Sequence, residues 1–167
     1  MTHSGSFLAP CVADEVFAML SDPQRFAPTL PDFESMQMQD ATHFKLRVVI
    51  ALGQIRGHAN LAMELCEAVR PSQVHYRGEA VVAGGQLGMA IRFSLEADGV
   101  GTSVQWEGEV QLDAMLTFLT GNLLETAGRD NFERMAERLQ DEFRTLPPAG
   151  TAHGPTAATA AEIDYEI

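Results

Sequence analysis

Apolar and polar residues alternate along most of the chain between Phe33 and Leu112. A period of two puts all apolar side chains of a segment on one face, which predicts antiparallel strands with one buried and one solvated side. Turn residues separate the segments at Gly53, Arg70-Pro71-Ser72, Gly84-Gly85 and Asp98-Gly99, so the strands should form a meander. The alternating segments are 44–52, 55–65, 74–82, 87–95 and 104–112.

The residues before this region predict a strand followed by short helices. Thr2–Ala9 reads as a first strand that Pro10 ends. Apolar residues then recur at helical spacing over Ala13–Ser21, and a further turn over Gln24–Ala27 precedes the next prolines.

A helical period returns after Asp113, which we expect to be the N-cap. An apolar stripe runs from Leu116 to Phe143, and Pro147-Pro148 follows it. Gly121 and Gly128 weaken this long helix and predict a kink. The order of elements therefore indicates an α+β fold, a curved antiparallel sheet of six to seven strands with a long C-terminal helix.

Composition divides the chain and excludes several classes of partner. Its 167 residues are 46% apolar, so residues 1–144 can form one folded domain. Residues 145–167 are rich in Ala, Thr and Pro and carry only acidic charges, which predicts a flexible acidic tail. The net charge is −12 and Lys45 is the single lysine, which argues against nucleic acid and against electrostatic binding to anionic lipid.

The two cysteines predict no disulfide framework. Cys11 and Cys66 lie in no metal-binding motif, and we expect both to be buried free thiols in a reducing compartment. The N-terminal residues lack the pattern of a secretory signal, and no apolar run is long enough to span a membrane. These features predict a cytoplasmic protein.

Small residues stand at the centre of three predicted strands, on the apolar face. They are Gly57, Ala59, Gly78, Ala80 and Gly108. Two interpretations remain open: the glycines allow the sheet to curve sharply, or the small side chains leave a cavity for a ligand. Under the second, the helix contributes Leu119, Asn122 and Leu123 to the lining. The remaining lining residues would be Phe44, Val48, Leu61, Met63, Tyr76, Met89, Ile91, Phe93 and Trp106.

This inward face carries no ionisable side chain in the predicted register. Acid–base catalysis needs a titratable group in the cleft, and His58, His75 and Glu64 alternate onto the outer face. A slip of one residue would exchange the faces and bring Glu64 or His58 inside. We therefore assign no catalytic residue, and we expect neither a metal nor a resident cofactor.

The start of the last helix is apolar on more than one side. In the segment MLTFLTGNLL, Leu116, Leu119 and Leu123 fit the core stripe, which leaves Met115, Phe118 and Leu124 exposed. Such residues would serve as a lid, a dimer patch or an edge that touches a membrane.

Three segments resemble the helix-grip proteins of the SRPBCC superfamily, which includes START and polyketide-cyclase-like proteins. The segments are SGSFLAPCVADEVFAMLSDPQRFAPTLPDFES, IRGHANLAMEL and GVGTSVQWEGEVQL, and within the superfamily they are most similar to the G subunit of carbon monoxide dehydrogenase. The resemblance implies a sheet that grips the last helix around a deep apolar pocket. It also implies an accessory role to a carbon monoxide dehydrogenase-type molybdenum hydroxylase, held at the inner face of the cytoplasmic membrane, with a quinone-like lipid in the pocket. It supplies no shared catalytic motif.

Three functional hypotheses follow. The first is non-enzymatic binding of a hydrophobic small molecule or lipid. The second is a cyclase-like, aromatase-like or hydrolase-like enzyme that uses the same pocket, for which Tyr76, Asn122 or Glu64 in a shifted register are the candidate polar groups. The third is an interaction module with a filled core, including a homodimer through the exposed helix start. A cavity larger than roughly 300 Å³ separates the first two from the third.

Overall fold

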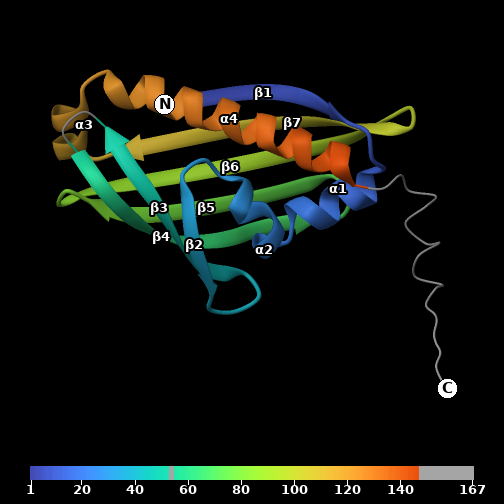
Figure 1. Ribbon diagram of the computed structural model, residues 1–167, viewed down its shortest axis with the longest axis horizontal. Coiled ribbons are helices and arrows are strands. Elements are labelled where there is room, and N and C mark those ends of the chain that lie inside the picture. The colour runs from blue at the N-terminus through green and yellow to red at the C-terminus, as the bar shows by residue number, and fades with distance from the viewer. Residues whose placement is uncertain (53–54, 147–167) are drawn as a thin grey trace.

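The computed structural model describes residues 1–52 and 55–146, and the alternating segments of the sequence form one antiparallel sheet in it (Figure 1). The strands lie in the order β1-β7-β6-β5-β4-β3-β2, so β2 to β7 form the predicted meander and β1 pairs with β7 at one edge. The strands are β1 (Thr2–Ala9), β2 (Phe33–Met38), β3 (His43–Leu52), β4 (Ile55–Val69), β5 (Gln73–Val82), β6 (Gly85–Asp98) and β7 (Gly101–Leu112).

A tight turn connects β5 and β6. Between β5 and β6, Ala83 and Gly84 both have positive φ, at 51° and 83°. This conformation matches a type I′ turn, whose twist suits a two-residue hairpin. It confirms the turn that the sequence predicts at Gly84-Gly85.

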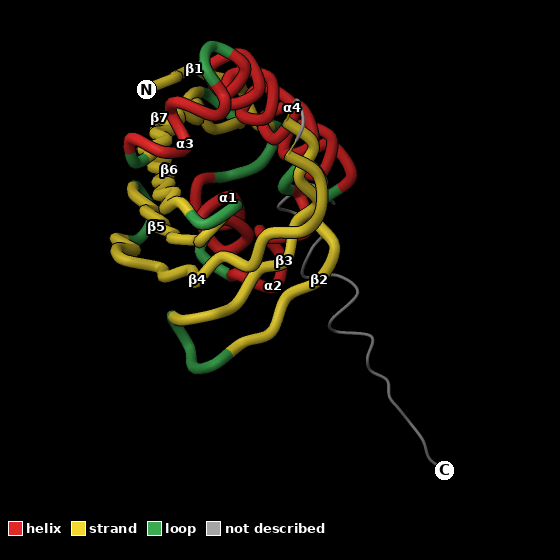
Figure 2. Tube along the Cα trace, turned by 90° about the vertical axis from the view of Figure 1, so that its left-hand side faces the viewer, coloured by secondary structure: helices red, strands yellow, loops and turns green. Residues whose placement is uncertain are grey.

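The helices complete the α+β arrangement that the sequence predicts. They are α1 (Ala13–Leu20), α2 (Pro23–Phe26), the 3₁₀ turn η1 (Ala27–Thr29), α3 (Ala114–Thr120) and α4 (Leu123–Thr145). The long helix α4 contacts β1 at one edge of the sheet and β3 and η1 near the other. It therefore crosses the open side of the curved sheet, as the end-on view shows (Figure 2).

The predicted single long helix is divided in two at Gly121. Asp113 caps α3 as expected, since its carboxylate accepts a hydrogen bond from the Leu116 amide at 3.0 Å. Gly121 then adopts φ 53°, which a helix cannot contain, whereas Gly128 lies within α4 without a break. The break changes the helical phase, so Leu124 is buried rather than exposed.

Aromatic residues fill the end of the sheet that α1 and α2 cover. The Tyr76 ring stacks on Phe26 with centroids 4.6 Å apart, and Phe93 and Phe44 meet these rings edge-on. The Tyr76 hydroxyl donates a hydrogen bond of 2.6 Å to the backbone carbonyl of Leu20. This end of the interior is a packed core.

Several expectations concern the termini and the cysteines. Thr145 still belongs to α4 and Leu146 packs against the core, so the folded part extends beyond the predicted boundary at residue 144. The rest of the predicted acidic tail and the predicted turn at Gly53 lie outside the described residues. Both cysteines are free, but Cys66 is exposed and only Cys11 is buried, because Cys66 follows Leu65 at an irregularity in the pairing of β4 with β5.

Candidate ligand-binding pocket

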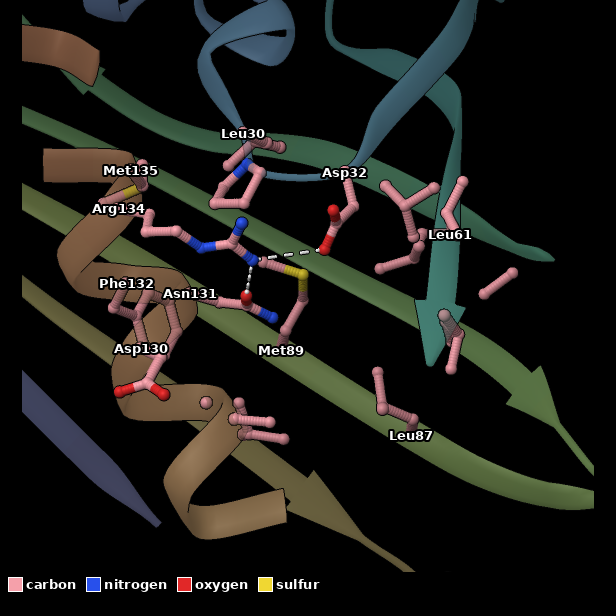
Figure 3. Close-up of a pocket in the computed structure, with 18 of the residues that line it drawn as sticks. Leu30, Asp32, Leu61, Leu87, Met89, Asp130, Asn131, Phe132, Arg134 and Met135 are labelled. Carbon is pink, nitrogen blue, oxygen red and sulfur yellow. Dashed lines mark hydrogen bonds and ion pairs between the residues drawn. The ribbon is translucent and has the colours of Figure 1, made fainter. Parts of the chain in front are cut away.

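A cavity of about 620 Å³ lies between α4 and the inner face of the sheet, toward the α3 end. This volume falls within the usual range for small-molecule sites, roughly 300–1,000 Å³. Strands β3 to β7 form its floor, and the helix and the loop after η1 form its wall and mouth (Figure 3).

The floor is apolar because every second side chain along each strand points inward, and these positions hold apolar residues. Its side chains are aliphatic or thioether groups, and the strands carry no polar side chain into it. The inward residues are Leu46, Val48, Ile50, Ala59, Leu61, Ala80, Val82, Leu87, Met89 and Val110.

The helix contributes a second apolar surface. Its lining residues follow helical spacing, so one apolar face of α4 lines the cavity. Charged residues of the helix lie at the edges of this face. The apolar helix residues are Leu124, Ala127, Gly128, Phe132 and Met135.

Some of the predicted lining residues do meet in the pocket. Val48, Ala59, Leu61 and Met89 line it, together with the small residue Ala80. The large residues nearer α1 and α2 are instead buried in the packed core. These are Phe44, Met63, Tyr76, Ile91, Phe93 and Trp106.

Of the two interpretations of the glycines, the structure does not support the one in which they leave space for a ligand. A Cβ atom on Gly78 would overlap the Met63 sulfur, and one on Gly108 would overlap the Phe132 ring, so side chains already fill both spaces. Gly57 is exposed with φ 144°, and a Cβ atom on it would meet no other atom within 4 Å, so it serves the backbone rather than the lining. Ala59 and Ala80, the other two small residues of the predicted set, do line the pocket.

The polar residues and the helix residues that the sequence predicts in the pocket lining do not lie there. Leu119 and Leu123 are 50% and 52% exposed and Asn122 is exposed, because the break at Gly121 turns them away from the sheet. The Tyr76 hydroxyl is engaged with Leu20, and burial raises its pKa well above the ordinary value. None of these groups faces the pocket.

Three polar residues that the sequence reasoning missed meet at the pocket mouth. Arg134 on α4 lies 3.3 Å from the Asp32 carboxylate and donates a hydrogen bond of 2.7 Å to the Asn131 side-chain oxygen. Figure 3 shows this group of side chains extending over the cavity. The sequence does contain a signal for two of them. Asn131 directly precedes Phe132, and Arg134 directly precedes Met135, so both polar residues lie next to the apolar stripe of the helix.

Backbone contacts hold the loop that carries Asp32. The Val49 amide donates to the Asp32 carbonyl at 2.9 Å, and Arg138 on α4 donates to the Leu30 carbonyl at 3.1 Å. Asp32 itself has φ 61°, a left-handed conformation that Asp tolerates better than most residues. The mouth is thus tied to both β3 and α4.

Charged side chains occur only at the rim of this pocket among the described lining residues. Asp32, Asp130, Glu133, Arg134 and Glu137 are all exposed, and neither His nor Cys contributes to the lining. The arrangement suits an apolar body below and a polar group at the mouth. Across residues 1–52 and 55–146, no helix is long and apolar enough to cross a membrane.

Comparison with solved structures identifies the fold. A START superfamily protein from Mycobacterium smegmatis matches with a TM-score of 0.66, at 13% identity over 87% of this chain and 99% of that one. A conserved protein from Geobacillus kaustophilus gives 0.73, at 13% identity over 86% and 95%. The Zhui aromatase/cyclase from a Streptomyces species gives 0.63, at 14% identity over 86% and 93%.

Sequence comparison identifies the family. The search of curated proteins finds no match. The family profile of the carbon monoxide dehydrogenase G subunit (CoxG), by contrast, matches residues 5–143, which include β2 to β7, part of β1 and nearly all of α4. The fold is similar to that of the START superfamily protein, and the chain belongs to the CoxG family.

Proposed function

We propose that this protein binds a hydrophobic small molecule or lipid in the α4 pocket without transforming it. The observation that carries this proposal is a cavity of about 620 Å³ whose floor consists only of apolar side chains. Burying apolar ligand surface there would contribute about 25 cal/mol per Å². The START-like fold supports the same function class.

An enzyme of the cyclase or hydrolase type is the second candidate, and its support is the similarity of fold to the Zhui aromatase/cyclase. Such chemistry needs a titratable group positioned against the substrate and shielded from water. Here Tyr76 is sealed in the core, and the carboxylates of the lining lie exposed at the rim. These positions favour binding over catalysis.

We further propose that the ligand is quinone-like and that the protein is an accessory to a carbon monoxide dehydrogenase-type molybdenum hydroxylase. Membership in the CoxG family supports this role. A second support is an exposed apolar surface, the α3 patch, formed by Met115, Phe118, Leu119 and Leu123. It directly precedes Leu124, which lines the pocket, so a membrane bound there would lie close to the cavity.

Filling the cavity tests the proposed function. Ala59 and Ala62 both lie on β4, but Ala59 is buried in the pocket and Ala62 is exposed on the opposite face. We expect Ala59→Phe to weaken binding of the neutral dye N-phenyl-1-naphthylamine and of decylubiquinone at least tenfold. Ala62→Phe should leave both affinities unchanged.

Fluorescence titration gives the affinities, and circular dichroism with urea unfolding shows that each variant is folded. Equal affinities in the wild type and a folded Ala59→Phe variant would refute binding in this pocket. Conversion of an aromatic polyketide by the wild type, abolished by Ala59→Phe, would instead favour the enzyme.

A further inference from the structure

The ion pair between Asp32 and Arg134 lies over an otherwise apolar cavity. Asp32 comes from the loop between η1 and β2 and Arg134 from the middle of α4, more than a hundred residues later, so the fold alone brings them together. Their side chains are 44% and 47% exposed, which leaves each of them room to meet a ligand. Both residues line the same pocket as Met89 of the apolar floor (Figure 3).

Asn131 is oriented by this pair. Its side-chain oxygen accepts the hydrogen bond from Arg134, so its amide nitrogen is the group left to donate elsewhere. In Figure 3 that nitrogen is turned toward Met89. Arg134 likewise carries five N–H donors, more than its contacts to Asp32 and Asn131 require. The mouth thus offers hydrogen-bond donors on both residues.

Charge determines which polar group these donors suit. The Asp32 carboxylate already neutralises Arg134, and Asp130, Glu133 and Glu137 add further negative charge around the mouth. An anionic head would have to compete with Asp32 and approach these carboxylates. A cationic head would have to separate Arg134 from Asp32. A neutral oxygen acceptor binds with the ion pair intact.

We propose that Arg134 and Asn131 form the head-group site of the pocket and select an amphipathic ligand with a neutral carbonyl oxygen over one with a carboxylate or an amine. This inference rests on the proposed function, since it places the apolar part of the same ligand in the cavity below. Asp32 sets the selectivity because it cancels the charge of Arg134.

A series of ligands with similar chains tests the selectivity. Displacement of N-phenyl-1-naphthylamine is measured with 2-tridecanone, dodecanoate and dodecylamine, all below the concentrations at which they form micelles. We expect the ketone to bind most tightly. Arg134→Met and Asn131→Ala should each weaken ketone binding about two- to tenfold, the effect of losing one hydrogen bond, and should weaken it more than dye binding, because the dye has no carbonyl oxygen.

Arg144→Met is the matched control. Arg144 lies on the same helix and pairs with Asp141 at 2.8 Å, but it does not line the pocket. Removing its charge should leave all affinities unchanged.

Asp32→Asn tests the role of charge directly. Asn also tolerates the left-handed conformation, so the loop should keep its shape. Without the carboxylate, Arg134 is no longer neutralised, and dodecanoate affinity should rise up to about fivefold while ketone affinity changes little.

The outcomes separate the two proposals. Suppose that Ala59→Phe abolishes dye binding but that Arg134→Met and Asn131→Ala leave ketone affinity unchanged. This result would refute the head-group site and would still support ligand binding in the pocket. Equal or tighter binding of dodecanoate than of ketone by the wild type would also refute it. Absence of dye binding by the wild type would refute the proposed function itself.

Discussion

The phenyl ring of Phe132 on α4 occupies the space that a side chain on Gly108 would need on β7. Phe132 also lines the pocket, so this contact sets both the approach of the helix to the sheet and the position of one pocket wall. The space beside Gly108, which one of the two interpretations assigned to a ligand, is filled by the protein's own aromatic residue.

Gly108→Ala should therefore destabilise the protein and reduce its pocket. The added methyl group overlaps the Phe132 ring, and overpacking of this kind costs about 1–3 kcal/mol of unfolding free energy. Displacement of the ring into the cavity should also weaken dye binding. Urea unfolding and dye titration measure the two effects.

Gly88→Ala on β6 is the matched control. Its new Cβ would lie 3.9 Å from the Gln111 Cβ, which is ordinary contact, and Ala is better suited than Gly to a strand interior. We expect no loss of stability. Equal effects of the two substitutions would contradict the assigned contact between Gly108 and Phe132.

Periodicity predicted the sheet well because it depends on local alternation. The first strand, Thr2–Ala9, has the predicted bounds, and Val48, Ala59 and Leu61 face inward as expected. Alternation also shows which side of a strand is apolar. It does not show how much of that side another element covers, so Phe44 and Phe93 were assigned to a pocket and lie in the packed core.

The helical part of the pocket was harder to predict because its phase depends on one glycine. A single helix through Gly121 would put Leu119 and Leu123 on the sheet side, whereas φ 53° at Gly121 starts a new helix in which Leu124 is buried. The polar mouth joins Asp32 and Arg134, which are distant in sequence. No local pattern predicts such a pairing, and only the fold brings it about.

Tyr76→Phe should lower stability without changing the pocket. The substitution removes the hydroxyl that donates to the Leu20 carbonyl at 2.6 Å and leaves that buried acceptor without its partner. We expect a loss of about 1–2 kcal/mol in urea unfolding. Affinity for N-phenyl-1-naphthylamine should not change, since the ring remains in the core; a clear decrease in a folded variant would contradict the placement of Tyr76 outside the pocket.

Phe118→Asp tests the α3 patch as a membrane-binding surface. Phe118 is 86% exposed, so the substitution should change stability by less than about 0.5 kcal/mol. Flotation with phosphatidylcholine vesicles should show at least a tenfold loss of binding, because an inserted phenyl ring contributes about 1.5–3 kcal/mol. With a net charge of −12, the wild type should bind phosphatidylglycerol vesicles more weakly than neutral ones.

Val100→Asp provides the comparison for that experiment. Val100 is 94% exposed in the turn between β6 and β7, at the opposite end of β7 from α3. The same apolar-to-acidic change there should leave vesicle binding intact. Equal losses of vesicle binding in both variants would indicate a general charge effect. Unchanged vesicle binding by Phe118→Asp would show that the α3 patch does not bind the membrane.

Asp113 should make the stability of the α3 region depend on pH. Its carboxylate accepts hydrogen bonds from the Leu116 amide and from the Gln86 amide, and these hold its pKa below the ordinary value of 3.8. A lowered pKa means that the folded state favours the charged form, so this contribution is present above about pH 4 and is lost as the pH falls further.

Asp113→Asn removes the titrating group but keeps a side chain that can cap α3. We therefore expect the variant to unfold at lower urea than the wild type at pH 6 and the difference to shrink by pH 3. The two urea midpoints at each pH give this difference directly. If the difference between the two urea midpoints stays constant from pH 6 to pH 3, the hydrogen bonds of Asp113 do not depend on its charge. If the difference increases toward pH 3, the pKa of Asp113 is raised rather than lowered in the folded state.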